Sequence, residues 1–207
     1  MNTKPDPAPS NTELELEFYR AVKDNDAGRT KELLQEPACS DLIRIDNKFL
    51  CKACSAGSAE VVRLLLDAGA EIDPANPLDW TPLHWACSSN KGGVEIVCTL
   101  IEAGCDVNAI DGDGQAPLHK ACDLGRPEIV RLLLEHGADP EAENHFGVTP
   151  LDLAINKATV DAAWGLMAQY KIAKGLNHEK VLEVIQELAP EAYFSKWVQT
   201  SPSPGKR

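Results

Sequence analysis

Three pairs of side chains have a spacing that could bind a metal ion. The pairs are Cys51 and Cys54, His84 and Cys87, and His119 and Cys122, and two residues separate the members of each pair. Thiolate sulfur and imidazole nitrogen are preferred ligands of Zn²⁺, and a structural zinc site needs four such ligands that converge on one point. Whether these pairs can meet depends on the elements that carry them.

The pairs belong to a repeating unit whose clearest copy is residues 111–142. A Gly-rich turn leads into Pro117, which suits the first turn of a helix because its fixed φ and missing N–H do no harm there. Residues 123–126 interrupt this helix, and the apolar run 127–136 predicts a second one. Gly137 then supplies a left-handed stop. The predicted unit is therefore turn, helix, turn, helix.

Shifting the sequence against itself shows further copies of the unit. Thr149-Pro-Leu lies 33 residues after Ala116-Pro-Leu, and Thr81-Pro-Leu-His lies 35 residues before it. The two extra residues fall in the polar turn 88–93, where an insertion disturbs packing least. Thr81 and Thr149 can cap the helices that follow them, whereas Ala116 cannot. A period near 33 with the entry Thr-Pro-Leu-His resembles the ankyrin repeat family.

This resemblance implies an all-α fold, an ankyrin-repeat solenoid of about five stacked helix-turn-helix units with β-hairpin turns and C-terminal capping helices. The repeat domain would cover residues 12–174, with units at 12–43, 44–76, 77–110, 111–143 and 144–174. The first unit is degenerate, and its second helix is expected to end before Pro37. Residues 175–200 are expected to form a helical cap, and residues 1–11 and 201–207 disordered tails.

The repeat register gives the cysteines a structural explanation. Cys54, Cys87 and Cys122 occupy the same position of successive units, just after an alanine of the helix, where a small buried residue is needed. The pairs are then about one repeat apart, so we expect no metal site and no cofactor. An odd number of cysteines also suits a reducing compartment.

In the ankyrin family the histidine of this entry motif hydrogen-bonds to the backbone of a neighbouring unit. The resemblance implies the same role for His84 and His119. No serine, cysteine or carboxylate is placed by local sequence to form a nucleophile and base with either histidine. We therefore expect no catalytic residues and no enzyme activity.

The charge of the chain limits its partners. The net charge is −12, and residues 47–147 supply −9 of it, from 16 acidic and 7 basic side chains. Nucleic acids and anionic membranes are poor partners for such a field, and a basic segment of a protein is a better one. With no apolar run near 18 residues and a polar, Pro-rich N-terminus, we expect a soluble protein in the cytoplasm and also in the nucleus. We expect the chain on its own to be a monomer.

Positions that differ between the units are the candidates for partner binding, because positions that agree form the scaffold. In ankyrin proteins these variable positions form hairpin tips and a concave groove that bind partners. By resemblance the candidate residues are Leu78, Trp80, Asp111, Asp113, Gln115, Asp123, Leu124, His145 and Phe146. Trp80 is the expected anchor, or else it packs over the adjoining hairpin. Asp111 and Asp113 are expected to project from the tip of a turn.

The sequence thus indicates a non-catalytic protein-protein interaction module, an intracellular adaptor, inhibitor or escort. Two alternatives remain open. The chain could be a regulatory subunit of an enzyme complex, or a structural protein that self-associates through its C-terminal helices. In that segment Tyr193, Phe194 and Trp197 lie at helical spacing and would either seal the end of the stack or bind a partner.

Overall fold

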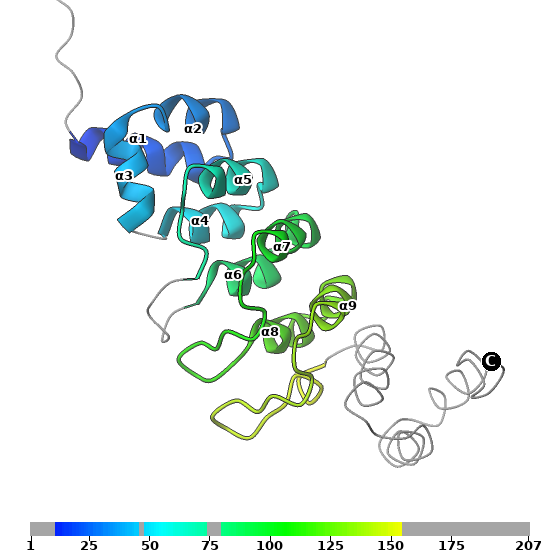
Figure 1. The fold of residues 1–207 in the computed structure, drawn as a ribbon. Helices are drawn as coiled ribbons and strands as arrows, with labels where there is room; N and C mark the ends of the chain where they lie inside the picture. Colours follow the sequence, from blue (N-terminus) through cyan, green and yellow to red (C-terminus); the bar gives the residue numbers. More distant parts are fainter. Residues whose placement is uncertain (1–10, 46–47, 74–79, 155–207) are drawn as a thin grey trace, which may run out of the picture. The chain divides into compact units, whose positions relative to one another are not determined.

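The computed structural model describes residues 11–45, 48–73 and 80–154, and these residues form nine α-helices and no strand (Figure 1). An all-α fold is therefore confirmed. The chain divides into two compact units, residues 1–112 and residues 113–207. Most of the predicted fifth repeat, residues 1–10 of the predicted N-terminal tail, the predicted C-terminal tail and the predicted C-terminal cap lie outside the described residues. Asn11, the last residue of the predicted N-terminal tail, instead begins a helix.

The first unit is built from two layers of helices. It holds α1 (Asn11–Lys23), α2 (Ala27–Leu33), α3 (Pro37–Ile45), α4 (Lys48–Ala56), α5 (Ala59–Asp67), α6 (Pro82–Ser88) and α7 (Gly93–Glu102). α1 packs on α4 and α4 on α6, which forms one layer, while α2 packs on α5 and α5 on α7 to form the other. The repeats of the solenoid in this compact unit are three helix pairs, α1 with α2, α4 with α5, and α6 with α7.

The apolar stripes of these helices form the core of the first unit. α5 shows the pattern, since Val61, Val62 and Leu65 are completely buried while the Ser58 hydroxyl accepts a hydrogen bond from the Val61 N–H at 3.3 Å and so caps the helix start. Each buried Val or Leu side chain stabilises the fold by roughly 1.5–3 kcal/mol. The predicted stripe of α1 is also present, with Phe18 and Val22 fully buried.

One helix of the first unit departs from the repeat. α2 ends at Leu33, before Pro37 as expected, but Pro37 then begins a further helix, α3, which the repeat pattern does not predict. A proline suits this position because the first turn of a helix leaves its N–H groups unpaired. Cys39 and Ile43 are buried on one face of α3, which gives this short segment a reason to be helical.

The described part of the second unit is a single helix pair followed by a loop. α8 (Pro117–Asp123) and α9 (Pro127–Glu135) pack against each other. Gly137 follows α9 with φ +89°, which is the left-handed stop that the sequence predicts. The turn-helix-turn-helix prediction is therefore confirmed for residues 111–137.

The described helices are short. The longest, α1, has 13 residues and so extends about 20 Å, whereas a bilayer core is about 30 Å thick. Among the described residues, no helix is long and apolar enough to cross a membrane.

Candidate protein-binding surfaces

A loop in the second unit presents the most exposed large apolar side chain of the described residues. The Phe146 residue is 74% exposed. The Asn144 side-chain oxygen accepts hydrogen bonds from the N–H groups of Phe146 at 2.9 Å and Val148 at 3.0 Å, and the Asn144 N–H donates to the Val148 carbonyl at 3.0 Å. The loop is thus closed by its own buried asparagine, which holds an aromatic ring out in solvent.

The same loop is connected to the turn before α8. The His145 N–H donates to the Asp113 carbonyl at 3.0 Å. Gly114 has φ +75°, and a Cβ at this position would lie 2.6 Å from Cδ2 of His145 and 2.9 Å from its backbone nitrogen. Only glycine permits both the left-handed backbone and this approach. Asp113 and His145, both exposed, are therefore brought together by the fold.

The buried side chain of His119 hydrogen-bonds both to this loop and to the start of α8. Its Nδ1 accepts from the Ala116 N–H at 3.0 Å, so its Nε2 carries the proton and donates to the Val148 carbonyl at 3.1 Å. The inter-repeat role that the resemblance implies for His119 is thus confirmed. His84 accepts in the same way from the Thr81 N–H, at 3.2 Å, and the Thr81 hydroxyl caps α6 as predicted.

The remaining predicted residues of this region differ in exposure. Asp123 and Leu124 are exposed at the C-terminal end of α8, whereas Gln115 is half-buried just before its N-terminal end. The projection predicted for Asp111 is wrong, since this residue is only 3% exposed. The turn occupies residues 112–114, so Asp111 lies at the base of the turn and Asp113 in the turn itself.

In the first unit, Trp80 packs against a second tryptophan. Its ring centroid is 4.8 Å from that of Trp85, with the rings tilted by 59°, and 6.3 Å from the ring of His84. Trp80 itself is half-buried, whereas Trp85 is 38% exposed. Leu78, the other predicted residue here, lies outside the described residues.

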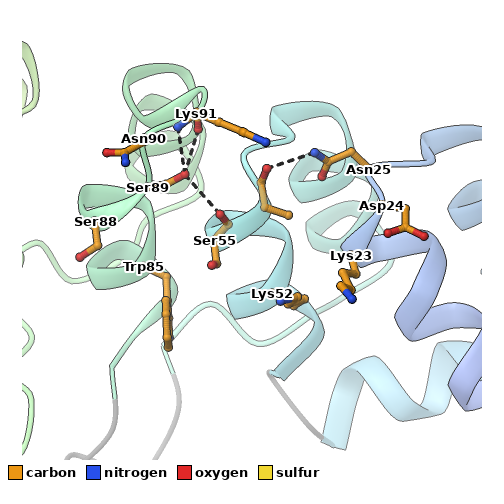
Figure 2. A pocket seen from close by; sticks show the side chains of 11 residues that line it. Lys23, Asp24, Asn25, Lys52, Ser55, Trp85, Ser88, Ser89, Asn90 and Lys91 are labelled. Carbon is orange, nitrogen blue, oxygen red and sulfur yellow. Dashed lines mark hydrogen bonds between the residues drawn. The ribbon is translucent and has the colours of Figure 1, made fainter.

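Trp85 lines a groove in the first unit with a volume of about 610 Å³ (Figure 2). The groove runs across three successive helix pairs. Its lining residues come from the end of α1, from α4, and from α6 with the turn that follows it: Lys23, Asp24, Asn25, Lys52, Ser55, Ala56, Trp85, Ser88, Ser89, Asn90 and Lys91. Pockets of this size commonly accept ligands.

Hydrogen bonds between successive helix pairs of the first unit hold the backbone that lines the groove. The Asn25 amide donates to the Ala56 carbonyl at 3.1 Å, and the Ser89 hydroxyl lies 3.3 Å from the Ser55 carbonyl oxygen and 3.0 Å from that of Lys91 (Figure 2). The Ser89 oxygen also accepts from the Lys91 N–H at 3.3 Å. Side chains of two turns therefore hold the backbone at the end of α4, Asn25 from the preceding helix pair and Ser89 from the following one.

Two glycines allow these turns to approach each other. Gly57 has φ +90°, and a Cβ there would lie 2.5 Å from the Lys91 Cβ and 2.6 Å from its carbonyl oxygen. A Cβ on Gly92, whose φ is +60°, would lie 2.8 Å from the Gly57 carbonyl oxygen. The turn after α6 is therefore pressed directly against the turn after α4.

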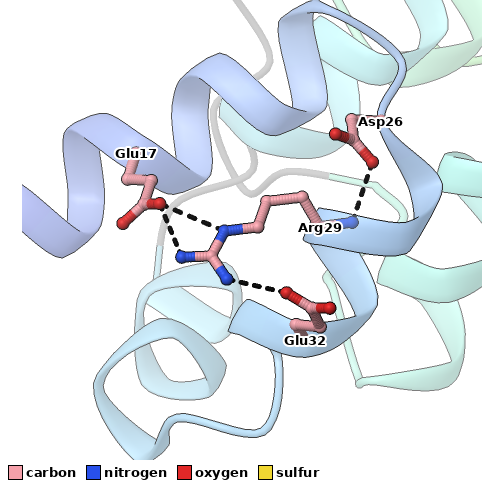
Figure 3. A network of polar contacts seen from close by, with 4 residues as sticks. All are labelled: Glu17, Asp26, Arg29 and Glu32. Carbon is pink, nitrogen blue, oxygen red and sulfur yellow. Dashed lines mark hydrogen bonds and ion pairs between the residues drawn. The ribbon is translucent and has the colours of Figure 1, made fainter.

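An ion-pair network joins α1 and α2 at the end of the first unit (Figure 3). The Arg29 guanidinium contacts the Glu17 carboxylate at 2.6 Å and that of Glu32 at 2.7 Å, and Asp26 caps α2 by accepting from the Arg29 N–H at 2.8 Å. The hydrogen bonds to Glu17 and then Glu32 raise the pKa of Arg29. The network is exposed to solvent, so its ion pairs contribute little to the stability of the fold.

The predicted residue set did not include this groove. In the repeat register, the position of Trp85 is held by Lys52 in the preceding repeat and by Lys120 in the following repeat. This variation between repeats is a signal that the sequence contains, whereas the predicted binding residues all come from the turns and from positions that follow each first helix. Lys91 lies in the turn 88–93, which holds the two-residue insertion and is expected to be where an insertion disturbs packing least.

The cysteines are placed as core residues. Cys54, Cys87 and Cys122 are completely buried, as the register predicts. Burial raises the pKa of the Cys122 thiol to about 12 and that of Cys54 well above its usual value. Burial, with the nearby Asp73 and Asp106, also raises the pKa of Cys105 to about 12. Within the described ranges, no group of three or more His, Cys, Asp or Glu side chains could hold a metal ion.

Comparison with known proteins agrees with the repeat architecture. The family model for ankyrin repeats (3 copies) matches residues 18–111 and 89–178. Human Protein phosphatase 1 regulatory subunit 27 is 36% identical over 104 residues, and its mouse counterpart is 37% identical; the match covers 50% of this chain and 45% of each relative. The putative ankyrin repeat protein YahD of Escherichia coli (strain K12) is 33% identical over 134 residues, 64% of this chain and 52% of that protein.

The chain thus spans about half the length of the curated relatives that it matches. The family match covers most of the chain, and the described helix pairs have the turn-helix-turn-helix form that the repeat period predicts. The chain belongs to the ankyrin repeat family.

Proposed function

We propose that this protein is a non-catalytic protein-protein interaction module, acting as an adaptor, inhibitor or escort. Ankyrin repeats bind other proteins, and variation between units tunes them to particular partners. The observation that carries the proposal is the exposed Phe146 on its fixed loop. A large aromatic ring at 74% exposure gains little from the folded monomer but has much surface to bury in a complex.

The surroundings of Phe146 suggest the chemistry of the client. Four acidic residues of the second unit are exposed, three on its turns and loops and one at the end of α8: Asp113, Glu141, Glu143 and Asp123. Acidic groups of this kind speed the encounter with a basic segment, while the aromatic ring slows its release. We therefore propose a basic client for this surface, with Asp113, His145 and Phe146 as its centre.

Crosslinking at Phe146 tests this proposal. A photoreactive phenylalanine analogue is placed at position 146 in the full chain, and at Leu16 of α1, which is 49% exposed, as the control. The protein crosslinked only from position 146 is then purified, and its affinity is measured. Phe146→Ala should weaken binding about 30-fold, which corresponds to about 2 kcal/mol.

Two results would oppose the proposal. One is a Phe146→Ala variant that binds the crosslinked protein within about threefold of the unmodified chain, since a central anchor contributes more than 1 kcal/mol. The other is a client whose contacting segment is acidic. A folding control is included, because circular dichroism should show the same helix content for both chains.

A second candidate is a regulatory subunit of an enzyme complex. Two relatives carry the name Protein phosphatase 1 regulatory subunit 27, and the identity extends over half of this chain. A direct test measures binding of the purified chain to the catalytic subunit of protein phosphatase 1. Binding would support a regulatory role, and its absence at micromolar concentrations would leave the adaptor proposal as stated.

A further inference from the structure

The groove of the first unit has a charge opposite to that of the chain. Three lysines, Lys23, Lys52 and Lys91, line it together with a single carboxylate, Asp24. The whole chain carries a net charge of −12. None of the three lysines forms an ion pair with another described residue. The groove therefore concentrates unpaired positive charge on an acidic protein.

An aromatic surface accompanies these lysines. Trp85 is 38% exposed and is supported by the ring of Trp80 at 4.8 Å. The Lys52 ammonium lies 5.9 Å from the Tyr19 ring centroid, close enough for a cation-π contact that limits its motion. The lysine ammonium groups can pair with a carboxylate of a ligand, while the neighbouring aromatic ring packs on an apolar side chain of the same ligand.

The insertion in the repeat contributes directly to the groove. The turn of residues 88–93 is two residues longer than its counterpart in the following unit, and it contains Asn90 and Lys91. The Ser89 hydroxyl and the close contact of Gly57 with Lys91 fix its backbone. The lengthened turn therefore places a cation, Lys91, at a defined position in the lining of the groove.

From this geometry we propose that the groove docks an acidic, extended peptide segment of a partner protein. Carboxylates of the segment pair with Lys23, Lys52 and Lys91, and one apolar side chain packs on Trp85. The proposal rests on the proposed function as an interaction module, and it assigns a second docking surface distinct from the Phe146 loop.

The charge distribution favours a short segment over a larger polyanion. A nucleic acid or an anionic membrane extends far beyond the groove and meets the repulsion of the whole chain. A short segment lies within a few ångströms of the lysines, where local attraction dominates because salt screens more distant charges over about 10 Å. Salt weakens both effects, so lysine variants are a more decisive test than ionic strength.

Selection from a peptide library provides the experiment. Random 12-residue peptides displayed on phage are selected against the full chain, and the best binders are synthesised with a fluorescent label for anisotropy measurements. We expect acidic peptides that contain an aromatic or aliphatic residue. Lys23→Gln/Lys52→Gln/Lys91→Gln should weaken their binding by about tenfold or more, and Trp85→Ala by a similar factor.

A matched variant separates the groove from net charge. Arg20→Gln/Lys31→Gln/Arg131→Gln changes three exposed cations outside the groove lining by the same total charge and should bind the peptides within about twofold of the unmodified chain. Melting curves confirm that each variant is folded. Equal weakening by both triple variants would overturn the proposal, because a general charge effect would then explain the binding.

Other outcomes decide the two proposals separately. Selected peptides that are basic, or acidic peptides that keep their affinity for the groove variant and lose it with Phe146→Ala, overturn the groove proposal and leave the interaction module intact. Failure to select any peptide also overturns it. Binding of a labelled oligonucleotide or anionic vesicles at the same lysines, without acidic peptides, would assign the groove to a different ligand and overturn it as well.

Discussion

Replacing His119 by alanine should destabilise the second unit and release the loop that carries Phe146. The imidazole is completely buried and satisfies two backbone groups that are far apart in sequence. Its Nδ1 accepts from the Ala116 N–H at 3.0 Å, and its Nε2 donates to the Val148 carbonyl at 3.1 Å. The histidine therefore couples the start of α8 to the candidate binding loop.

The expected loss follows from these contacts. Ala116 is 2% exposed, so its N–H would lose its partner without gaining water, which costs about 1–3 kcal/mol. The lost bond to Val148 adds about 1 kcal/mol. These two terms sum to about 2–4 kcal/mol, and the cavity left by the ring adds to this loss. The total is a large part of the roughly 5–15 kcal/mol that stabilises a typical domain.

Urea unfolding of the full chain, followed by far-ultraviolet circular dichroism, measures this loss. Amide hydrogen exchange reports the local effect, and exchange at Ala116 and at residues 144–148 should accelerate more than exchange in α5. His145→Ala is the matched control, because His145 is exposed in the same loop and should change stability by less than about 0.5 kcal/mol. A His119→Ala loss below about 1 kcal/mol would refute the reasoning.

Three further predictions concern stability and the cysteines. Gly57→Ala should destabilise the chain by at least about 2 kcal/mol more than Gly104→Ala in urea unfolding, because both glycines have φ near +90° but only the first is crowded by a neighbouring turn. Hydrogen bonds from the Thr149 N–H and hydroxyl lower the pKa of Asp152, so this carboxylate should contribute stability above its ordinary pKa of 3.8 that is lost as pH falls through the lowered value; Asp152→Asn should be less stable at pH 7 and converge with the unmodified chain in acid. A thiol reagent at pH 7.5 should leave Cys54 and Cys122 unlabelled in the folded chain, and metal analysis should find no stoichiometric zinc.

The repeat made much of the fold predictable. A proline at the helix start, an apolar run and a glycine stop specify α8 and α9 locally, and the structure has them within a residue or two of the expected bounds. The burial of Cys54, Cys87 and Cys122 followed from register alone. Each repeat carries the same local sequence features, so their recurrence at a fixed period supports the predicted helices more strongly than a single copy would.

Features that occur once were harder to predict. Among the described residues α3 has no counterpart in the other repeats, and its two buried apolar side chains give only a weak helical pattern. Asp111 and Asp113 are two residues apart in one Gly-rich turn, yet one is buried and the other exposed. Composition counts both as acidic residues, and only the position of the turn at residues 112–114 determines which of the two is exposed.

The net charge of the chain and the local charge of the groove have opposite signs. A net charge of −12 favours a basic partner, because composition sums charges over the whole surface. Binding responds to charges within a few ångströms of the ligand, and the groove gathers Lys23, Lys52 and Lys91 from three separate turns or helices. One of them, Lys91, lies in the turn 88–93, whose two extra residues are a deviation from the repeat period. In a repeat protein the deviations from the period are therefore where partner chemistry should be sought, since the regular positions are already occupied by the scaffold.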